Sequence, residues 1–406
     1  MDTGDTAWVL ISTALVLFMT PGLAFFYGGM VRSKNVLGML MYNFFAIGLI
    51  AVIWAVVGYS LAFGGDTAGG LIGNLDHVGL KDTGGGEGIP TIIFVAFQMT
   101  FAVITPALIS GAVADRMKFS AWAVFIGIWS IVVYSPVAHW VWAAGGWIFE
   151  MEALDFAGGT VVHINAGAAA LALILVLGRR NGWPNEPMPP HNLPFTLLGT
   201  GILMFGWFGF NAGSALAANE IAAVALMNTF LAGSAGMLGW LVVERIKDGH
   251  ATTLGAASGV VAGLVAITPC AGFVSGLSPI VIGAIAGGLC FLAIQLKYKF
   301  RYDDSLDVIG VHLVGGIIGS VILGFFASTG ANEGGRDGLF FGGGTALLID
   351  QIVATLVTLA FSFVVSFVLA KVIDATIGLR VDPDAENAGL DTSQHAETAY
   401  AMAGRI

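Results

Sequence analysis

Charged residues are scarce in this sequence. Asp, Glu, Lys and Arg make up 10% of its 406 residues, whereas soluble domains carry about 25%. Hydrophobic residues account for 57%, and the mean hydropathy is +0.87. This composition argues against soluble domains, and we predict that lipid surrounds most of the chain.

Cysteines are few in the sequence, and it contains no basic stripe. The two cysteines, Cys270 and Cys290, lie inside apolar runs, so the sequence predicts neither a disulfide framework nor a metal cluster. A net charge of −10 without a basic stripe argues against nucleic-acid binding. The sequence has no nucleophile elbow and no phosphate-binding loop, so we expect neither an enzyme nor a bound cofactor.

Apolar runs long enough to cross a bilayer, roughly 20 residues each, occur eleven times. They predict an all-α polytopic membrane protein with eleven transmembrane helices. The predicted spans are 6–30, 35–63, 89–113, 119–142, 158–178, 194–214, 219–243, 252–271, 279–296, 308–328 and 345–374. Acidic Asp2 and Asp5, rather than basic residues, precede the first run, so we expect a membrane helix there and no cleavable leader.

Basic residues alternate between loops in a way that predicts the orientation. Of the 16 Lys and Arg residues, 14 fall on one side of the predicted membrane, and only Lys81 and Arg336 fall on the other. The positive-inside rule therefore places the N-terminus outside and the C-terminus in the cytoplasm of a multi-pass plasma-membrane protein. We predict a transmembrane domain at 1–375 and a cytoplasmic tail at 376–406.

An internal repeat relates the two halves of the chain. His163 and His312 each lie four residues before a glycine, in the fifth and tenth predicted spans. Phe-Tyr-Gly-Gly at 26–29 and Phe-Asn-Ala-Gly at 210–213 match in the first and sixth spans. Repeats of five spans, 1–5 and 6–10, would be inverted in the membrane and would place a transport site near its midplane. The eleventh helix lies outside the repeat.

His163 and His312 are also the two histidines with apolar neighbours on both sides inside predicted spans. Ionisable groups at such positions are costly, and they indicate function more often than packing. One such histidine alone would be interpreted as a helix contact. Two at matched positions favour a facing pair that shares a hydrogen and lines a narrow path, because neutral imidazole both donates and accepts.

Asp155 precedes the fifth predicted span, and Asp307 precedes the tenth. Either carboxylate could cap the following helix, and Asp155 could instead bind a cation directly. We favour capping for both, with an electrostatic benefit from Asp155 to a nearby cation.

Aromatic residues are dense where predicted spans reach the external side. They are Phe97, Phe101, Trp140, Trp142, Trp207 and Phe210. Phe97 and Phe101 are four residues apart and share a helix face. Such residues commonly anchor helices at the interface, but a Trp face also attracts cations by roughly 0.5 to 2 kcal/mol. The residues alone leave both roles open.

Two motifs carry a resemblance to a known family. The stretch DFAGGTVVHINA at 155–166 resembles the signature of the ammonium transporter family (Amt/Mep/Rh), and GWFGFNAGS at 206–214 resembles its sixth-helix motif. Further similarity at 26–29, 96–98, 310–312 and 378–381 extends it over nearly the whole chain.

The resemblance implies a homotrimer of eleven-helix protomers, each with its own pore. It implies a recruitment site for ammonium, with methylammonium as analogue, at Phe101, Trp142 and Ser214, supported by Asp155. It also implies a gate of Phe101 and Phe210 and a twin-histidine pore at His163 and His312. From the residues themselves, we expect Phe97, Trp207 and Asp307 to be supporting positions. Tail segments 389–391 and 395–400 resemble the part that binds PII signalling proteins.

The expected function is electrogenic ammonium transport. Ammonium would lose a proton, and ammonia would pass the histidines while the proton travels separately. Two alternatives stay open at this point, a passive channel for ammonia gas and an ammonium sensor read by a cytoplasmic partner.

Overall fold

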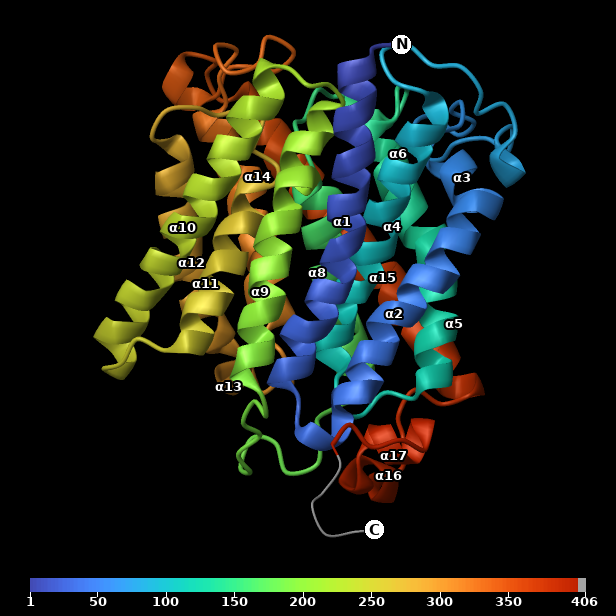
Figure 1. The fold of residues 1–406 in the computed structure, drawn as a ribbon, viewed down its shortest axis with the longest axis vertical. Helices are drawn as coiled ribbons and strands as arrows, with labels where there is room; N and C mark the ends of the chain where they lie inside the picture. Colours follow the sequence, from blue (N-terminus) through green and yellow to red (C-terminus); the bar gives the residue numbers. More distant parts are fainter. Residues whose placement is uncertain (401–406) are drawn as a thin grey trace.

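Helices that run along one common direction form the structure, a computed structural model that describes residues 1–400 (Figure 1). No β-strand occurs in this part of the chain, only two isolated bridges. The long helices are α1 (Thr3–Met30), α2 (Val36–Ile53), α4 (Thr91–Val113), α5 (Phe119–Trp129), α8 (Asn165–Leu177), α9 (Leu193–Trp207), α10 (Glu220–Asp248), α11 (Thr253–Ile267), α12 (Ser278–Ile294), α14 (Val314–Phe326) and α15 (Ala346–Thr376). The shorter ones are α3 (Tyr59–Phe63), α6 (Ser135–Trp142), α7 (Trp147–Glu150), α13 (Leu296–Phe300), α16 (Pro383–Ala388) and α17 (Leu390–His395).

Five π-helical turns lie within or at the ends of these helical runs. They are η2 (Trp54–Gly58), η4 (Ser130–Tyr134), η5 (Gly159–Ile164), η6 (Phe208–Ala212) and η8 (Ile309–Leu313). A π-helical turn inserts one residue into the i to i+4 hydrogen-bond pattern and is common at functional sites. Three of them carry residues named above, since His163 lies in η5, Phe210 in η6 and His312 in η8.

Ten helical segments are long and apolar enough to cross a membrane. The eighth predicted span, 252–271, differs because its helix α11 covers only 15 residues, Thr253–Ile267. Fifteen helical residues extend about 22 Å, less than the roughly 30 Å of a hydrocarbon core. Pro269 follows two residues after the end of α11, and because proline has no N–H it cannot donate the hydrogen bond that would continue the helix. The helix therefore ends earlier than the apolar run predicts.

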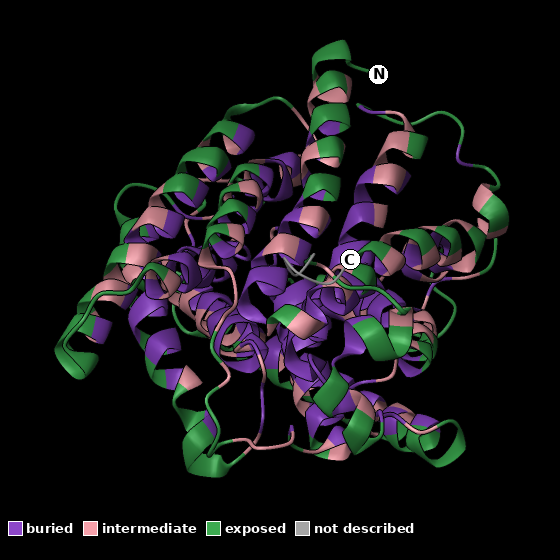
Figure 2. Cartoon of the chain, turned by 60° about the horizontal axis from the view of Figure 1, so that its bottom comes forward, coloured by how far each residue is buried: buried purple, intermediate pink, exposed green. Residues whose placement is uncertain are grey.

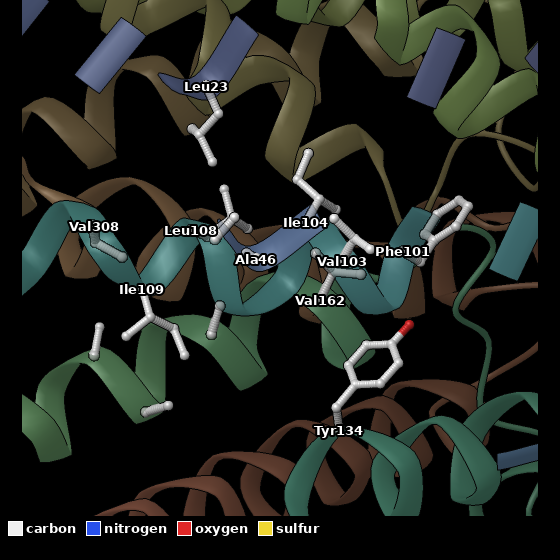
Figure 3. Packing of buried hydrophobic residues seen from close by; sticks show 14 of the residues in the cluster. Leu23, Ala46, Phe101, Val103, Ile104, Leu108, Ile109, Tyr134, Val162 and Val308 are labelled. Atoms are coloured by element: carbon white, nitrogen blue, oxygen red, sulfur yellow. The ribbon is translucent and has the colours of Figure 1, made fainter. Parts of the chain in front are cut away.

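The helices differ in how deeply they are buried. In the apolar window of η5 and α8, 83% of residues are buried, compared with 28% in α15. Buried residues gather at the centre and exposed ones on the periphery (Figure 2). Figure 3 shows α4 in this interior, with Phe101, Ile104 and Leu108 among its packed side chains. The α4 and α8 helices thus form the centre of the molecule.

The last two helices, α16 and α17, lie at the opposite end of the molecule from the N-terminus (Figure 1). The second of them, α17, contacts the beginning of α2, where Leu390 N–H donates to Asn35 Oδ1 (2.7 Å) and Gly38 N–H donates to Asp391 Oδ1 (2.8 Å). The predicted tail, 376–406, is thus folded onto the helical body as far as residue 400. Residues 401–406, which include Arg405, lie outside the described part.

Close helix packing at small residues gives a first prediction. A Cβ at Gly283 in α12 would collide with the backbone carbonyl of Ala232 in α10, whereas a Cβ at Gly48 in α2 would meet nothing within 4 Å. Overpacking costs about 1–3 kcal/mol. We expect Gly283→Ala to lower the unfolding temperature of the detergent-solubilised protein, and Gly48→Ala to leave it nearly unchanged. Equal unfolding temperatures for the two variants would show that the α10–α12 contact tolerates a methyl group.

Candidate functional site

A cavity of about 130 Å³, which we call the outer cavity because it lies toward the ends of several helices rather than at the centre of the molecule, is the first candidate site. Phe101, Trp142 and Ser214, which lie far apart in the sequence, all line it. The remaining lining residues are Phe63, Phe94, Gln98, Phe156 and Leu216. The cavity is therefore mainly aromatic, with a hydroxyl and an amide as its polar groups.

Hydrogen bonds orient the polar groups around this cavity. Trp142 Nε1 donates to the backbone carbonyl of Asp155 (3.0 Å), which fixes the indole. Ser214 Oγ donates to the carbonyl of Phe210 (2.8 Å), so its own oxygen stays free to accept. Gln98 Oε1 is buried and accepts no hydrogen bond from any described residue. The cavity thus offers hydrogen-bond acceptors beside aromatic faces, a combination suited to a small cation that carries N–H groups.

Asp155 does not line the cavity. Its carboxylate accepts hydrogen bonds from the N–H groups of Gly158 (2.7 Å), Gly159 (2.6 Å), Thr160 (2.8 Å) and Val161 (3.2 Å), and from the Thr160 hydroxyl. These N–H groups begin η5 and have no partner within the helix. Burial raises the pKa of the Asp155 carboxyl, and the hydrogen bonds from Thr160, Gly158 and Gly159 oppose that rise. The carboxylate caps the helix that carries His163.

Two phenylalanine rings close the inner side of the cavity. The ring centroids of Phe101 and Phe210 are 4.4 Å apart, with an angle of 46° between their planes. Phe97 packs edge-on against Phe101 at 5.0 Å, and Trp207 lies 5.3 Å from Phe210. All four side chains are at most 2% exposed. Phe210 also lines the space beyond the rings, so the ring pair separates that space from the cavity.

The space beyond the rings contains the two histidines. It measures about 10 Å³, close to the smallest volume that holds one water molecule. His163 and His312 line it together with Phe26, Trp207, Phe210 and otherwise Met19 and aliphatic side chains. The two imidazoles are nearly parallel, with 14° between their planes, and their Nδ1 atoms are 3.2 Å apart. One Nδ1 must donate and the other must accept, so a single hydrogen lies between them.

The carboxylate that caps the second histidine helix is Asp304, and the prediction that Asp307 does so is wrong. Asp304 accepts from the N–H groups of Val308 (3.1 Å) and Ile309 (2.7 Å). Asp307 instead pairs with Lys297 Nζ at 2.6 Å. Burial and the charge of Asp307 raise the pKa of Asp304 to about 7. Like Asp155 before His163, Asp304 lies eight residues before its histidine, and this shared spacing is the signal that could have identified it from the sequence.

Gln98, Phe63 and Leu216 line the cavity but were not predicted from the sequence as site residues. Gln98 could have been noticed as an amide inside an apolar run. Phe63 and Leu216 carry no such signal, because only the fold brings them to the cavity. Trp140, which the sequence grouped with Trp142, does not line the cavity, since its Nε1 donates to the carbonyl of Leu71 (2.7 Å).

Comparison with known proteins gives consistent matches along the chain. The model of the family described as Ammonium Transporter Family matches residues 7–400. An ammonium transporter of Mycobacterium bovis is 52% identical over 99% of this chain and 91% of its own length. One from Bacillus subtilis is 48% identical over 98% of this chain and 99% of its own.

Solved structures agree with this assignment. Saccharomyces cerevisiae Mep2 superimposes with a TM-score of 0.88 at 36% identity, over 95% of this chain and 88% of its own. A structure titled "Sensor Amt Protein" superimposes with a TM-score of 0.90 at 28% identity, over 96% of this chain and 98% of its own. With its apolar helices, this chain is therefore a multi-pass membrane protein that belongs to the ammonium transporter family.

Proposed function

We propose that this protein transports ammonium by separating it into ammonia and a proton at the contact between Phe101 and Phe210. The observation that supports this most directly is the position of that ring pair. Phe101 lines the outer cavity, Phe210 lines the space that holds the histidines, and the two centroids are 4.4 Å apart. The ring pair thereby separates a cavity suited to a cation from the small, mainly apolar space that contains the two histidines.

Recruitment of ammonium would take place in the outer cavity. The faces of Trp142 and Phe101 attract a cation, and Ser214 Oγ and Gln98 Oε1 supply acceptors for its N–H groups. Asp155 contributes through its field rather than as a ligand, because its oxygens already hold the N–H groups of η5. Together these groups replace part of the water shell that the ion loses.

The ring pair would then select against ions. No polar group stands between Phe101 and Phe210 to replace the hydration of a charge, and a charge in such a place is costly. Desolvation lowers the pKa of an amine, so ammonium transfers its proton to water in the outer cavity and passes the rings as neutral ammonia. Potassium has no proton to release and stays excluded.

Conduction would follow the two histidines. Ammonia passes the pair as a neutral molecule, and the hydrogen shared between the two Nδ1 atoms, 3.2 Å apart, provides a route for the proton. The proton crosses separately from ammonia, so net transport is electrogenic. Phe97 and Trp207 support the gate by packing against its rings, and Asp307 supports the second histidine helix through Lys297.

The proposal includes the topology and assembly of the protein. Eleven crossings in two inverted five-helix repeats plus an eleventh helix would place the N-terminus outside and the tail, 376–406, in the cytoplasm. We propose a homotrimer in the plasma membrane, a transmembrane domain at 1–375, and a tail that binds a PII signalling protein. The position of α16 and α17 at the end opposite the N-terminus supports this orientation.

Two other functions remain as alternatives. A passive ammonia channel would use the same apolar space without moving charge. An ammonium sensor is favoured by one observation, the similarity over 96% of this chain to the structure titled "Sensor Amt Protein". Ammonium-driven current across a reconstituted membrane distinguishes electrogenic transport from both alternatives.

The histidine pair gives the first functional prediction. Replacing either histidine by Leu removes the shared hydrogen, so His163→Leu and His312→Leu should each abolish ammonium current in proteoliposomes on a solid-supported membrane. His250→Leu, at an exposed histidine, is the matched control and should keep the wild-type current. Undiminished current with unchanged selectivity in the two pore variants would reject the proton relay.

The outer cavity gives a second functional prediction. Trp142→Leu removes a cation–π contact of about 0.5–2 kcal/mol, so the half-saturation concentration for ammonium current should rise about 2- to 30-fold. Trp147→Leu, at a partly buried Trp of α7 that does not line the cavity, serves as the control. If competition by methylammonium is the same in Trp142→Leu as in the wild type, Trp142 has no part in recruitment.

A further inference from the structure

One buried amide connects the last long helix to the external loop that holds Asp155. Gln351 lies near the beginning of α15 and is 1% exposed. Its Oε1 accepts from Leu154 N–H (2.7 Å), while its Nε2 donates to the carbonyls of Leu154 (2.9 Å) and Ser320 (2.9 Å). Only one orientation of the amide satisfies an N–H and two carbonyls together, so its placement is determined by its partners.

The residue that Gln351 holds is next to the groups around the cavity. Gln351 binds both the N–H and the carbonyl of Leu154, as a paired strand would, and Leu154 immediately precedes Asp155. The carbonyl of Asp155 accepts from Trp142 Nε1, and its carboxylate caps η5. A shift of Leu154 would therefore move the indole and the beginning of the helix that carries His163.

A second, more exposed tether acts on the same loop. Arg336 Nη1 pairs with Asp350, the residue before Gln351, at 2.8 Å and donates to the carbonyl of Glu152 at 3.2 Å. The side chain of Arg336 is 27% exposed, so water competes for its contacts. The buried Gln351 has no such competitor, and its loss would leave the N–H and carbonyl of Leu154 and the carbonyl of Ser320 without partners.

Other polar side chains on the same face of α15 have different partners. Ser362 Oγ donates to the carbonyl of Asn165 (2.8 Å), and Ser366 Oγ accepts from Trp129 (2.9 Å). Thr355 is also buried, but its hydroxyl has no partner among the described residues. Among these residues, Gln351 is the one whose contacts lead to the outer cavity.

We propose that Gln351 is a positioning residue for recruitment, holding Leu154 so that Trp142 and Asp155 keep their places beside the outer cavity. This inference rests on the proposed function of that cavity. It gives α15, which lies outside the predicted repeat, a part in setting the affinity of the external site. Gln351 itself touches no substrate.

The test compares Gln351→Met with a matched variant on the same helix face. Methionine keeps the length of the side chain and removes all three hydrogen bonds, whereas Thr355→Val removes a buried hydroxyl that has no partner. In proteoliposome recordings, Gln351→Met should raise the half-saturation concentration for ammonium about 3- to 10-fold with maximal current retained, while Thr355→Val should leave both unchanged. A fall in maximal current alone, or equal behaviour of the two variants, would overturn the proposal.

A double-mutant cycle tests whether Gln351 acts through Trp142. In a Trp142→Leu background, the additional change Gln351→Met should alter the half-saturation concentration by less than in the wild-type background, because the group it positions is absent. Independent, multiplicative effects would overturn the proposal. If Gln351→Met cannot be purified in folded form, Gln351→Glu, which keeps the side-chain length and the acceptor for Leu154 N–H, enters the same cycle with the same expected coupling.

The two proposals fail in different ways. If Trp142→Leu alone changes nothing, the outer cavity is not the recruitment site and the proposed function fails at that step. If Trp142→Leu raises the half-saturation concentration while Gln351→Met behaves as Thr355→Val does, the cavity stands and only the role of Gln351 is rejected.

Discussion

The contact between the rings of Phe101 and Phe210 is the constraint on which the rest of the site depends. With their centroids 4.4 Å apart and both side chains 1% exposed, the two rings keep the outer cavity apart from the space around the histidines. An ion that entered this contact would lose its hydration without compensation. The aromatic faces and acceptors outside, and the neutral imidazoles inside, are each suited to one side of that division.

The backbone before each histidine is stabilised in the same way in both halves of the chain. Each histidine lies on a π-helical turn whose free N–H groups are held by an aspartate eight residues earlier, Asp155 for His163 and Asp304 for His312. Buried backbone donors need partners, so these carboxylates stabilise the helix ends that bring the imidazoles together. The first role of both carboxylates is to accept hydrogen bonds from the helix ends, and any electrostatic effect on a nearby cation is additional.

Much of the fold and part of the site could be predicted from the sequence. Apolar run lengths predicted the helices, and the repeat identified His163 and His312 because matched histidines in apolar surroundings are rare. The early end of α11 at Pro269 was missed because hydropathy does not register backbone geometry. Asp307 was mistaken for a cap because it lies nearer to the tenth predicted span than Asp304 does, and the eight-residue spacing that Asp304 shares with Asp155 was overlooked; the structure shows that Asp304 reaches the N–H groups.

The residues that could not be predicted are those gathered by tertiary packing. Phe63 and Leu216 reach the outer cavity, and Gln351 reaches Leu154, from segments with no local pattern that connects them.

The size of the space between Phe210 and the histidines has a further consequence. At about 10 Å³, it has no room for a standing column of solvent. If ammonia takes this route, as we propose, each molecule must wait for neighbouring side chains to fluctuate, and the temperature dependence of permeation should then reflect how tightly this protein is packed.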